Sequence, residues 1–175
     1  TYSIFLNNNA TTIFTQNNPQ STSALYNWWG NNENPKTIVS SDVDISNWVI
    51  MNLTLSQNYI GVGETSTLTA TLNQYYLSSY YISRDLEEAL PSRTVIFTST
   101  SGSLNPISSA IVGSLNSVYT APLSKGTYYL YATIDNQQLY LPIVVGSGSS
   151  KIGTVISGSD FTESYGDGLF YNSTL

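Results

Sequence analysis

The stretch that decides the fold is VIMNLTLSQNYIGVGETSTLTATLN, residues 49–73. Its first part places an apolar side chain at every second position, at Met51, Leu53 and Leu55. Its last part repeats this spacing at Leu68, Ala70 and Leu72. A period of two puts alternate side chains on opposite faces of a β-strand. The stretch therefore predicts two strands of a sheet that has one buried face.

The same alternation continues to residue 145. The apolar positions are Val95, Phe97, Leu104, Tyr128, Leu130, Ala132, Ile134, Leu139, Leu141, Ile143 and Val145, and Val118 with Tyr119 forms a further short strand. Asp135 and Asn136 supply a hairpin turn between the last two runs. Seven short strands over about 100 residues are typical of an immunoglobulin-like Greek-key β-sandwich. We therefore expect an all-β chain with such a sandwich at 49–145.

Residues 1–34 have a different pattern. Short apolar runs around Phe5 and Ile13 are separated by asparagine-rich segments. Short strands joined by asparagine corners are typical of the coils of a parallel β-helix, in which stacked asparagines bond along the axis. Two or three coils cannot bury a core alone, so we expect further coils before Thr1.

The coils are expected to end at YNWWGNNENP, residues 26–35. Successive side chains of an extended backbone point to opposite sides, so Trp28 and Trp29 are expected to face opposite ways. One indole would cap the coils, and the other would face the next module. The alternative is that the two rings form an aromatic platform for binding a sugar.

The remaining segments divide the chain further. Residues 35–48 are interpreted as a connector, with Trp48 packed at the junction. Residues 74–90 are too long for a tight loop, and they form either an extra edge strand with a short helix or a binding loop that uses Tyr80 and Tyr81. Residues 146–151 have the composition of a flexible linker. Residues 152–175 hold about two strands, too few to fold alone, which begin a further Ig-like repeat or are donated to a partner's sheet.

Composition excludes several classes of function. The 175 residues carry a net charge of −6, and only 9% are charged. The five basic residues are scattered, which argues against a nucleic-acid surface and against charge-driven binding to an anionic membrane. No apolar run approaches the roughly 20 residues of a membrane-spanning helix, and no signal peptide is recognised. There is no cysteine, so stability has to come from β-packing or another kind of cross-link.

Catalytic chemistry is not expected. The chain has no histidine, so neither a Ser-His-Asp nor a Cys-His nucleophile is available, and zinc sites are disfavoured. Two paired acids would suffice for glycoside hydrolysis, but residues 1–34 hold only Glu33. We therefore expect no enzyme, no catalytic residue and no cofactor.

Weaker signals concern metal binding and covalent modification. Asp42 and Asp44 lie on one side of a strand and suit calcium at a domain joint, but solvated acids in a connector are the better explanation. Three glycosylation sequons begin at Asn9, Asn52 and Asn172. Lysines that would donate to an isopeptide bond are Lys36, Lys125 and Lys151. Each lies in an expected turn or linker, so we predict no such bond.

The order of these segments resembles a known family. The segments are, in order, NWWGNNENP, residues 49–73, PSRTVIFTSTSGSLNP, SVYTAPLSKGTYYLYATIDNQ and LPIVV. Together they resemble adhesin-like surface proteins of methanogenic archaea. In that family a right-handed parallel β-helix precedes immunoglobulin-like modules similar to intimin and invasin repeats. The resemblance covers nearly the whole chain and departs from the pattern at 74–90.

The resemblance implies an exported, non-catalytic protein on an archaeal cell surface. It implies adhesion to other cells or the building of an appendage, with other copies or modules of the same protein, or surface glycans or proteins of other cells, as partners. We expect neither nucleic-acid binding nor membrane insertion in this segment. A surface stalk, a filament subunit assembled by strand complementation and a carbohydrate-binding module are the three hypotheses.

Overall fold

The structure is a computed structural model that describes residues 2–6, 22–77, 80–82, 86–147, 160–164 and 170–174. For residues 77, 80–82, 160–164 and 170–174 it describes the backbone alone. The described chain is all-β apart from the 3-10 turn η1, Pro35–Thr37, as the sequence predicts. No helix in the described ranges is long and apolar enough to cross a membrane.

The strands follow one another along the chain. They are β1 (Thr22–Ser23), β2 (Val43–Asp44), β3 (Asn47–Leu55), β4 (Tyr59–Gly61), β5 (Thr65–Leu77), β6 (Tyr80–Ile82), β7 (Arg93–Ser99), β8 (Ser103–Asn105), β9 (Ser108–Ile111), β10 (Ser114–Thr120), β11 (Gly126–Ile134), β12 (Gln137–Gly146), β13 (Asp160–Ser164) and β14 (Phe170–Thr174).

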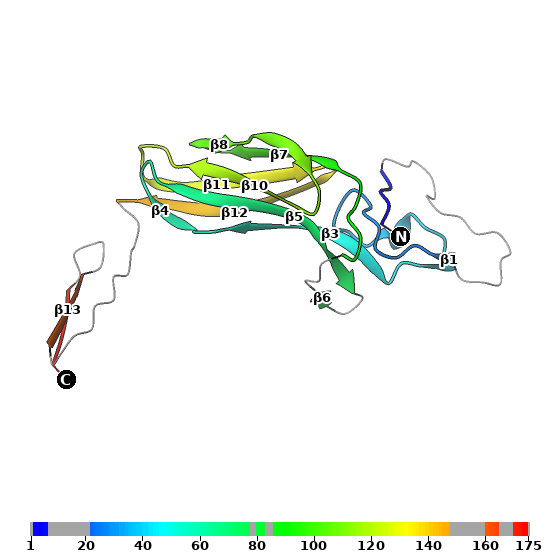
Figure 1. Ribbon diagram of the computed structural model, residues 1–175, viewed down its shortest axis with the longest axis horizontal. Coiled ribbons are helices and arrows are strands. Elements are labelled where there is room, and N and C mark those ends of the chain that lie inside the picture. Colours follow the sequence, from blue (N-terminus) through cyan, green and yellow to red (C-terminus); the bar gives the residue numbers. More distant parts are fainter. Residues whose placement is uncertain are drawn as a thin grey trace.

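Two five-stranded sheets form the sandwich (Figure 1). One has the order β3-β5-β10-β8, with β6 added on β5, and the other has the order β4-β12-β11-β7-β9. Pairing is antiparallel except between β4 and β12, which are parallel. Because β3 and β4 belong to different sheets, the chain changes sheets between Leu55 and Tyr59. This arrangement is a Greek-key sandwich of the immunoglobulin type.

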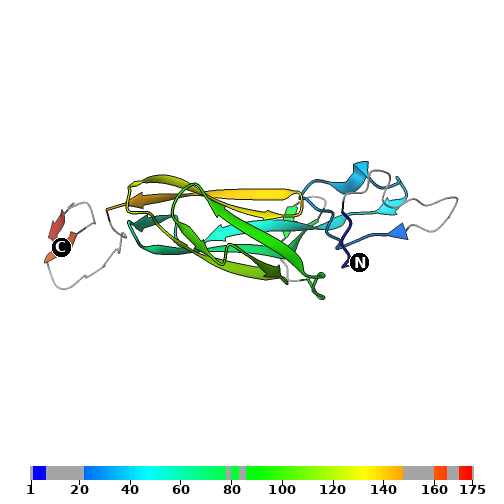
Figure 2. The same cartoon turned by 90° about the horizontal axis from the view of Figure 1, so that it is seen from above.

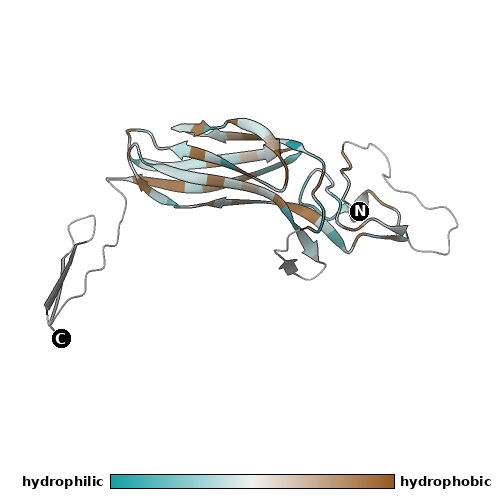
Figure 3. Ribbon diagram, in the orientation of Figure 1, coloured by the Kyte–Doolittle hydropathy of each residue, from teal (hydrophilic) through white to brown (hydrophobic). Residues whose placement is uncertain are grey.

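Alternate side chains of both sheets close a shared core, and Figure 3 shows the matching alternation of hydropathy along the strands. The predicted inward positions that are buried are Met51, Leu53, Leu68, Ala70, Leu72, Val95, Phe97, Leu104, Leu130, Ala132, Ile134, Ile143 and Val145. Tyr128, Leu139 and Leu141 are partly buried against the same core. In the short strand predicted at Val118 and Tyr119, which is part of β10, Tyr119 is buried and Val118 faces solvent.

The N-terminal segments pair in parallel. β1 pairs with β2, Ile4 forms a bridge with Trp28, and Asn27 forms a bridge with Trp48. Three successive pieces of chain thus lie side by side and point the same way, which is the pairing that a parallel β-helix uses. The described residues do not close a coil, and residues 7–21 lie outside the described ranges. The right-handed β-helix therefore stays a prediction.

β3 connects these segments to the sandwich without interruption. It begins at Asn47, inside the segment interpreted as a connector, and runs past the boundary expected at Val49. Its first residues pair with 26–27 on one side and with β5 on the other. The N-terminal segments therefore extend the first sheet beyond one end of the sandwich (Figure 2). The division into domains itself stays a prediction.

Other elements differ from the sequence-based expectation. The stretch 74–90 contributes the end of β5 and the extra strand β6, but Leu86–Leu90 forms bends rather than a helix. The short strands β4 and β9 were not foreseen, because three or four residues of mixed polarity carry no clear period.

Candidate functional site

The strongest cluster of specific contacts lies where the N-terminal segments meet the sandwich. We call it the joint and define it by residues 26–32, the start of β3 and the turn at Asp135–Gln137. Trp28 is fully buried in the sandwich core, whereas Trp29 is buried in a second cluster with Val43 and Trp48. The expectation that the two indoles face opposite ways is confirmed. Neither ring offers a face to a ligand, so the sugar platform on these two residues is not formed.

Asp135 is the charged centre of the joint. Trp28 Nε1 donates a hydrogen bond of 2.7 Å to Asp135 Oδ2. Arg93 Nε lies 3.1 Å from both carboxylate oxygens, and Arg93 Nη2 forms an ion pair with Oδ1. The Asp135 side chain is only 9% exposed, so these donors replace the water that the carboxylate loses. A buried charge is tolerated when it is paired and hydrogen-bonded in this way.

Asn32 fastens the joint to the edge of β3. Its Nδ2 donates to the Met51 carbonyl at 2.9 Å, and its Oδ1 accepts from the Met51 N–H at 2.7 Å. Its own N–H donates to Gln137 Oε1 at 2.8 Å. Opposite Met51 the pairing with β5 is shifted by a β-bulge. The asparagine side chain therefore acts as a short piece of β-strand against backbone groups at the sheet edge.

Gly30 allows the chain to leave the joint. Its φ is +88°, and a Cβ there would lie 2.9 Å from Leu6 Cδ2. Its carbonyl accepts a 3.0 Å hydrogen bond from the Asn136 N–H. A positive φ and close packing together favour glycine at this position.

Aromatic pairs complete the second cluster. Phe5 stacks on Trp29 with ring centroids 4.6 Å apart, and Trp48 packs on Tyr76 at 4.2 Å. The prediction that Trp48 packs at the junction is confirmed. Because these four rings come from four segments of the chain that pack in one cluster, they fix the N-terminal segments to the extended end of β5.

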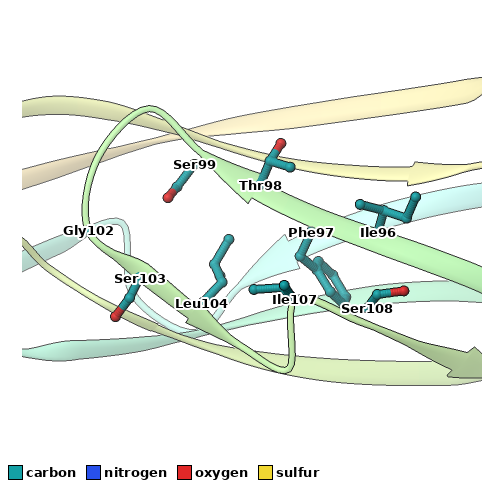
Figure 4. Close-up of a pocket in the computed structure, with 9 residues that line it drawn as sticks. All are labelled: Ile96, Phe97, Thr98, Ser99, Gly102, Ser103, Leu104, Ile107 and Ser108. Carbon is teal, nitrogen blue, oxygen red and sulfur yellow. The ribbon is translucent and has the colours of Figure 1, made fainter.

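The sandwich also has an open cleft between β7 and β8 (Figure 4). Its volume is about 490 Å³. Phe97, Leu104 and Ile107 line it, and Ile107 is 66% exposed. The lining holds serine and threonine hydroxyls but no charged side chain. The cleft can accept an apolar group, but it contains no acid, base or nucleophile pair that would perform chemistry on one.

One buried phenol lies beside this cleft. Tyr119 is fully buried, and its hydroxyl donates a 3.0 Å hydrogen bond to the Ser101 carbonyl. Burial raises the pKa of Tyr119 above its usual value, and the neighbouring Tyr128 adds to the rise. The ring also packs on Gly102, which has a φ of +81°. Sequence reasoning marked the spacing from Phe97 to Gly102 but missed this contact.

The predicted calcium ligands, Asp42 and Asp44, flank the buried Val43 at β2. Asp44 Oδ1 accepts the N–H of Ser46, so it serves as a local turn acceptor. Asp42 is exposed and precedes the buried Val43. Within the described ranges, no group of three or more acidic side chains could hold a metal ion. Metal binding by Asp42 and Asp44 stays a prediction.

The modification sites fall in different places. Asn52 is half-buried on β3, and its Oδ1 accepts the Leu53 N–H at 2.8 Å, while Thr54 is exposed. Asn172 lies in β14, where only the backbone is described, and Asn9 lies outside the described ranges. Glycosylation at these three sites stays a prediction, as does the absence of an isopeptide bond.

Two further predicted contact residues lie in the edge strand β6. Tyr80 and Tyr81 lie in β6, where only the backbone is described. β6 pairs with the end of β5, so these residues belong to the sheet extension that carries the joint. Their role as a ligand surface stays a prediction.

Comparison with known proteins gives structural likenesses only. No family model matches the chain, and no curated protein matches it. Among solved structures, a glycosyl hydrolase family 2 member from Bacteroides cellulosilyticus aligns with 16% identity and a TM-score of 0.43 over 55% of this chain. That alignment covers 14% of the hydrolase.

Two adhesins align over a similar share. A C-terminal fragment of intimin, solved with the intimin-binding domain of its translocated receptor, has 11% identity and a TM-score of 0.40 over 55% of this chain and 32% of the fragment. The Yersinia pseudotuberculosis adhesin InvE has 26% identity and a TM-score of 0.40 over 54% of this chain and 26% of InvE. This chain therefore spans well under half the length of these three proteins, and likenesses with TM-scores this low assign neither a family nor an activity.

Proposed function

We propose that this chain is a non-catalytic structural and adhesive segment of an extracellular surface protein. One observation carries the proposal. The chain enters the sandwich at one end through β3 and leaves at the opposite end through β12 (Figure 1). A module with this geometry extends a chain of modules in a line, and so holds a distal binding surface away from the cell.

The joint supports this role. Backbone pairing at 26–28, the buried Trp28–Asp135 hydrogen bond and the clamp of Asn32 on Met51 hold the N-terminal segments against the sandwich. A linker of glycine and serine would let the two parts pivot, whereas a shared sheet makes them one stiff unit. A stalk requires stiffness of this kind.

The finer assignment rests on the sequence resemblance. We propose a cell-surface adhesin-like protein of a methanogenic archaeon, with a right-handed β-helix at 1–34, the Ig-like sandwich and the start of a further repeat at 152–175. Its partners would be other modules of the same protein and surface glycans or proteins of other cells. The uncharged, threonine-rich strand faces suit a surface that resists nonspecific binding.

Surface display is tested by immunogold labelling of intact cells that produce the protein, with antibodies against residues 22–147. We expect dense label on unbroken cells, and proteinase treatment of those cells should remove it. Label that appears only after lysis would contradict the proposal.

A filament subunit is the second candidate, and one observation favours it. β13 and β14 pair only with each other among the described strands, and an isolated two-stranded hairpin is marginally stable. Such strands gain stability by completing a neighbour's sheet. Electron microscopy of the purified chain decides between the candidates, because regular filaments favour strand donation and single particles favour a stalk.

A further inference from the structure

The first and last strands of the sandwich run in the same direction. Hydrogen bonds from Val49 N–H to Asn27 and from Asn136 N–H to Gly30 place the starts of β3 and β12 together at the joint. β4 continues the path of β3 toward the other end, where it pairs in parallel with the end of β12. We call that other end, where β4 and β12 finish, the far end.

β4 and β12 meet in a compact patch at the far end. Val144 pairs with Tyr59, Val145 with Ile60 and Gly146 with Gly61. The Val144 N–H donates to the Asn58 carbonyl at 2.8 Å. Ile60 and Val145 are buried in the core. The patch thus combines backbone hydrogen bonds with side chains that are locked into the core.

Gly146, at the end of β12, leaves room for the aromatic ring of Tyr59. A Cβ at position 146 would overlap the ring and hydroxyl of Tyr59. Tyr59 therefore lies across Gly146, and this cross-strand contact covers the last hydrogen-bonded position of the patch. Any side chain at Gly146 would push the tyrosine away from β12.

Tension along the molecule loads this patch in shear. Pulling at the joint draws β3 and β4 toward the joint, while pulling beyond Gly146 draws β12 toward the far end. β4 and β12 are thus pulled along their own axes in opposite directions, so the hydrogen bonds between β4 and β12 carry the load together. When strands are instead pulled apart sideways at one end, each bond carries the whole load in turn.

We propose that the β4–β12 patch is a shear clamp through which the module bears tension. The inference deepens the proposed function, since a stalk segment transmits force, but the clamp itself is a property of the fold. On the edge of β12 opposite β11, strand pairing is confined to the patch, because β4 pairs only with residues 144–146. Pro142 has no N–H to offer a further strand on that edge. The direct connection between the two loaded strands is therefore concentrated at the far end.

The direction of pulling tests the clamp with its hydrogen bonds intact. The chain has no cysteine, so pairs of introduced thiols define unique attachment points for single-molecule force measurements. One protein carries Lys36→Cys and Ser147→Cys and is pulled along its axis. The other carries Val62→Cys and Ser147→Cys and is pulled sideways across the ends of β4 and β12. Lys36, Val62 and Ser147 lie outside every strand and are exposed or nearly so.

We expect the protein pulled through the axial pair of thiols, at positions 36 and 147, to rupture at a force several-fold higher than the protein pulled through the sideways pair, at positions 62 and 147. Both are pulled at the same loading rate. In the axial pair, rupture of the sandwich should release a contour length of about 300 Å, since its strands span Asn47–Gly146. Equal rupture forces for the two pairs would overturn the clamp. Loss of surface labelling would overturn the proposed function but leave this comparison unaffected, so the two failures are distinguishable.

A matched pair of proline variants tests the patch itself. Val144→Pro removes the N–H that bonds to Asn58, whereas Tyr140→Pro alters the same edge of β12 where no described strand pairs. Pulled axially, Val144→Pro should lower the rupture force at least twofold, and Tyr140→Pro should lower it much less. Equal losses in both variants would contradict the proposal. If Val144→Pro does not fold, the comparison of pulling directions still decides, because both of its proteins keep the patch.

Discussion

The Asn32 side-chain amide binds both backbone polar groups of Met51, 19 residues further along the chain. It donates to the carbonyl at 2.9 Å and accepts from the N–H at 2.7 Å. Because Met51 is buried and lies on the outer edge of the first sheet, these groups would otherwise lose their hydrogen bonds. The joint thus replaces a missing strand with one side chain.

Replacing Asn32 should therefore be costly. Asn32→Ala removes two hydrogen bonds and leaves two backbone groups unpaired, and we expect a loss of about 2 kcal/mol in the free energy of unfolding. Urea denaturation followed by tryptophan fluorescence measures it. Asn31→Ala is the control, since Asn31 Oδ1 only accepts the exposed Glu33 N–H, and it should change stability by less than about 0.5 kcal/mol. Equal effects would contradict the role of Asn32.

The Trp28–Asp135 hydrogen bond should appear as an energetic coupling. In a double-mutant cycle of Trp28→Phe and Asp135→Asn, we expect an interaction energy of about 2 kcal/mol, because the bond joins a buried donor to a charged acceptor. Trp29→Phe is the matched control, since the Trp29 Nε1 has no partner among the described residues. Its cycle with Asp135→Asn should be additive within about 0.5 kcal/mol.

Gly102 and Gly113 separate two causes of glycine preference. Both have positive φ, +81° and +73°. A Cβ at Gly102 would lie 2.7 Å from the Tyr119 ring, whereas a Cβ at Gly113 would meet nothing within 4 Å. We expect Gly102→Ala to cost about 3 kcal/mol, from backbone strain and overpacking together, and Gly113→Ala about 1 kcal/mol from strain alone. Thermal unfolding of the two variants checks this, and a reversed order would refute it.

The buried phenol of Tyr119 should make stability fall in alkali. Its pKa is raised above 10.0 in the folded state by burial, so above pH 10 the unfolded chain ionises this group before the folded chain does. Proton release then favours unfolding, and the stabilisation that is complete below pH 10 is lost as the pH rises toward the folded pKa. Tyr119→Phe should make the decline of unfolding free energy between pH 9 and 11 shallower. A decline as steep as that of the native chain would exclude Tyr119 as its source.

Side-chain alternation predicted the sandwich well. Leu130, Ala132 and Ile134 are buried as expected, because a period of two is a direct consequence of strand geometry. The opposite burial of Trp28 and Trp29 follows from the same geometry. Patterns of this kind are local, so they can be recognised in a single sequence.

The joint was not predictable in the same way. Arg93 lies in β7 and Asp135 in the turn between β11 and β12, far apart in the sequence, and a single ion pair leaves no periodic trace. Asn32 stands in an asparagine-rich run, where nothing distinguishes the residue that reaches β3 from its neighbours. The parallel bridges at Ile4 and Asn27 involve one residue each, which is too short a signal for any strand prediction.

Since β3 pairs both with the N-terminal segments and with β5, a cut at Val49 would divide a strand. A fragment starting at Val49 would lose Asn47 and Trp48, the first two residues of β3. It would also expose the Asp135 carboxylate on the side that Trp28 covers, and the backbone groups of β3 that residues 26–32 hydrogen-bond. The remaining sandwich would have an unpaired strand edge through which copies of the fragment could associate. Recombinant work on the sandwich therefore has to keep the preceding two dozen residues, and shuffling of such modules during evolution would have to move them as one block.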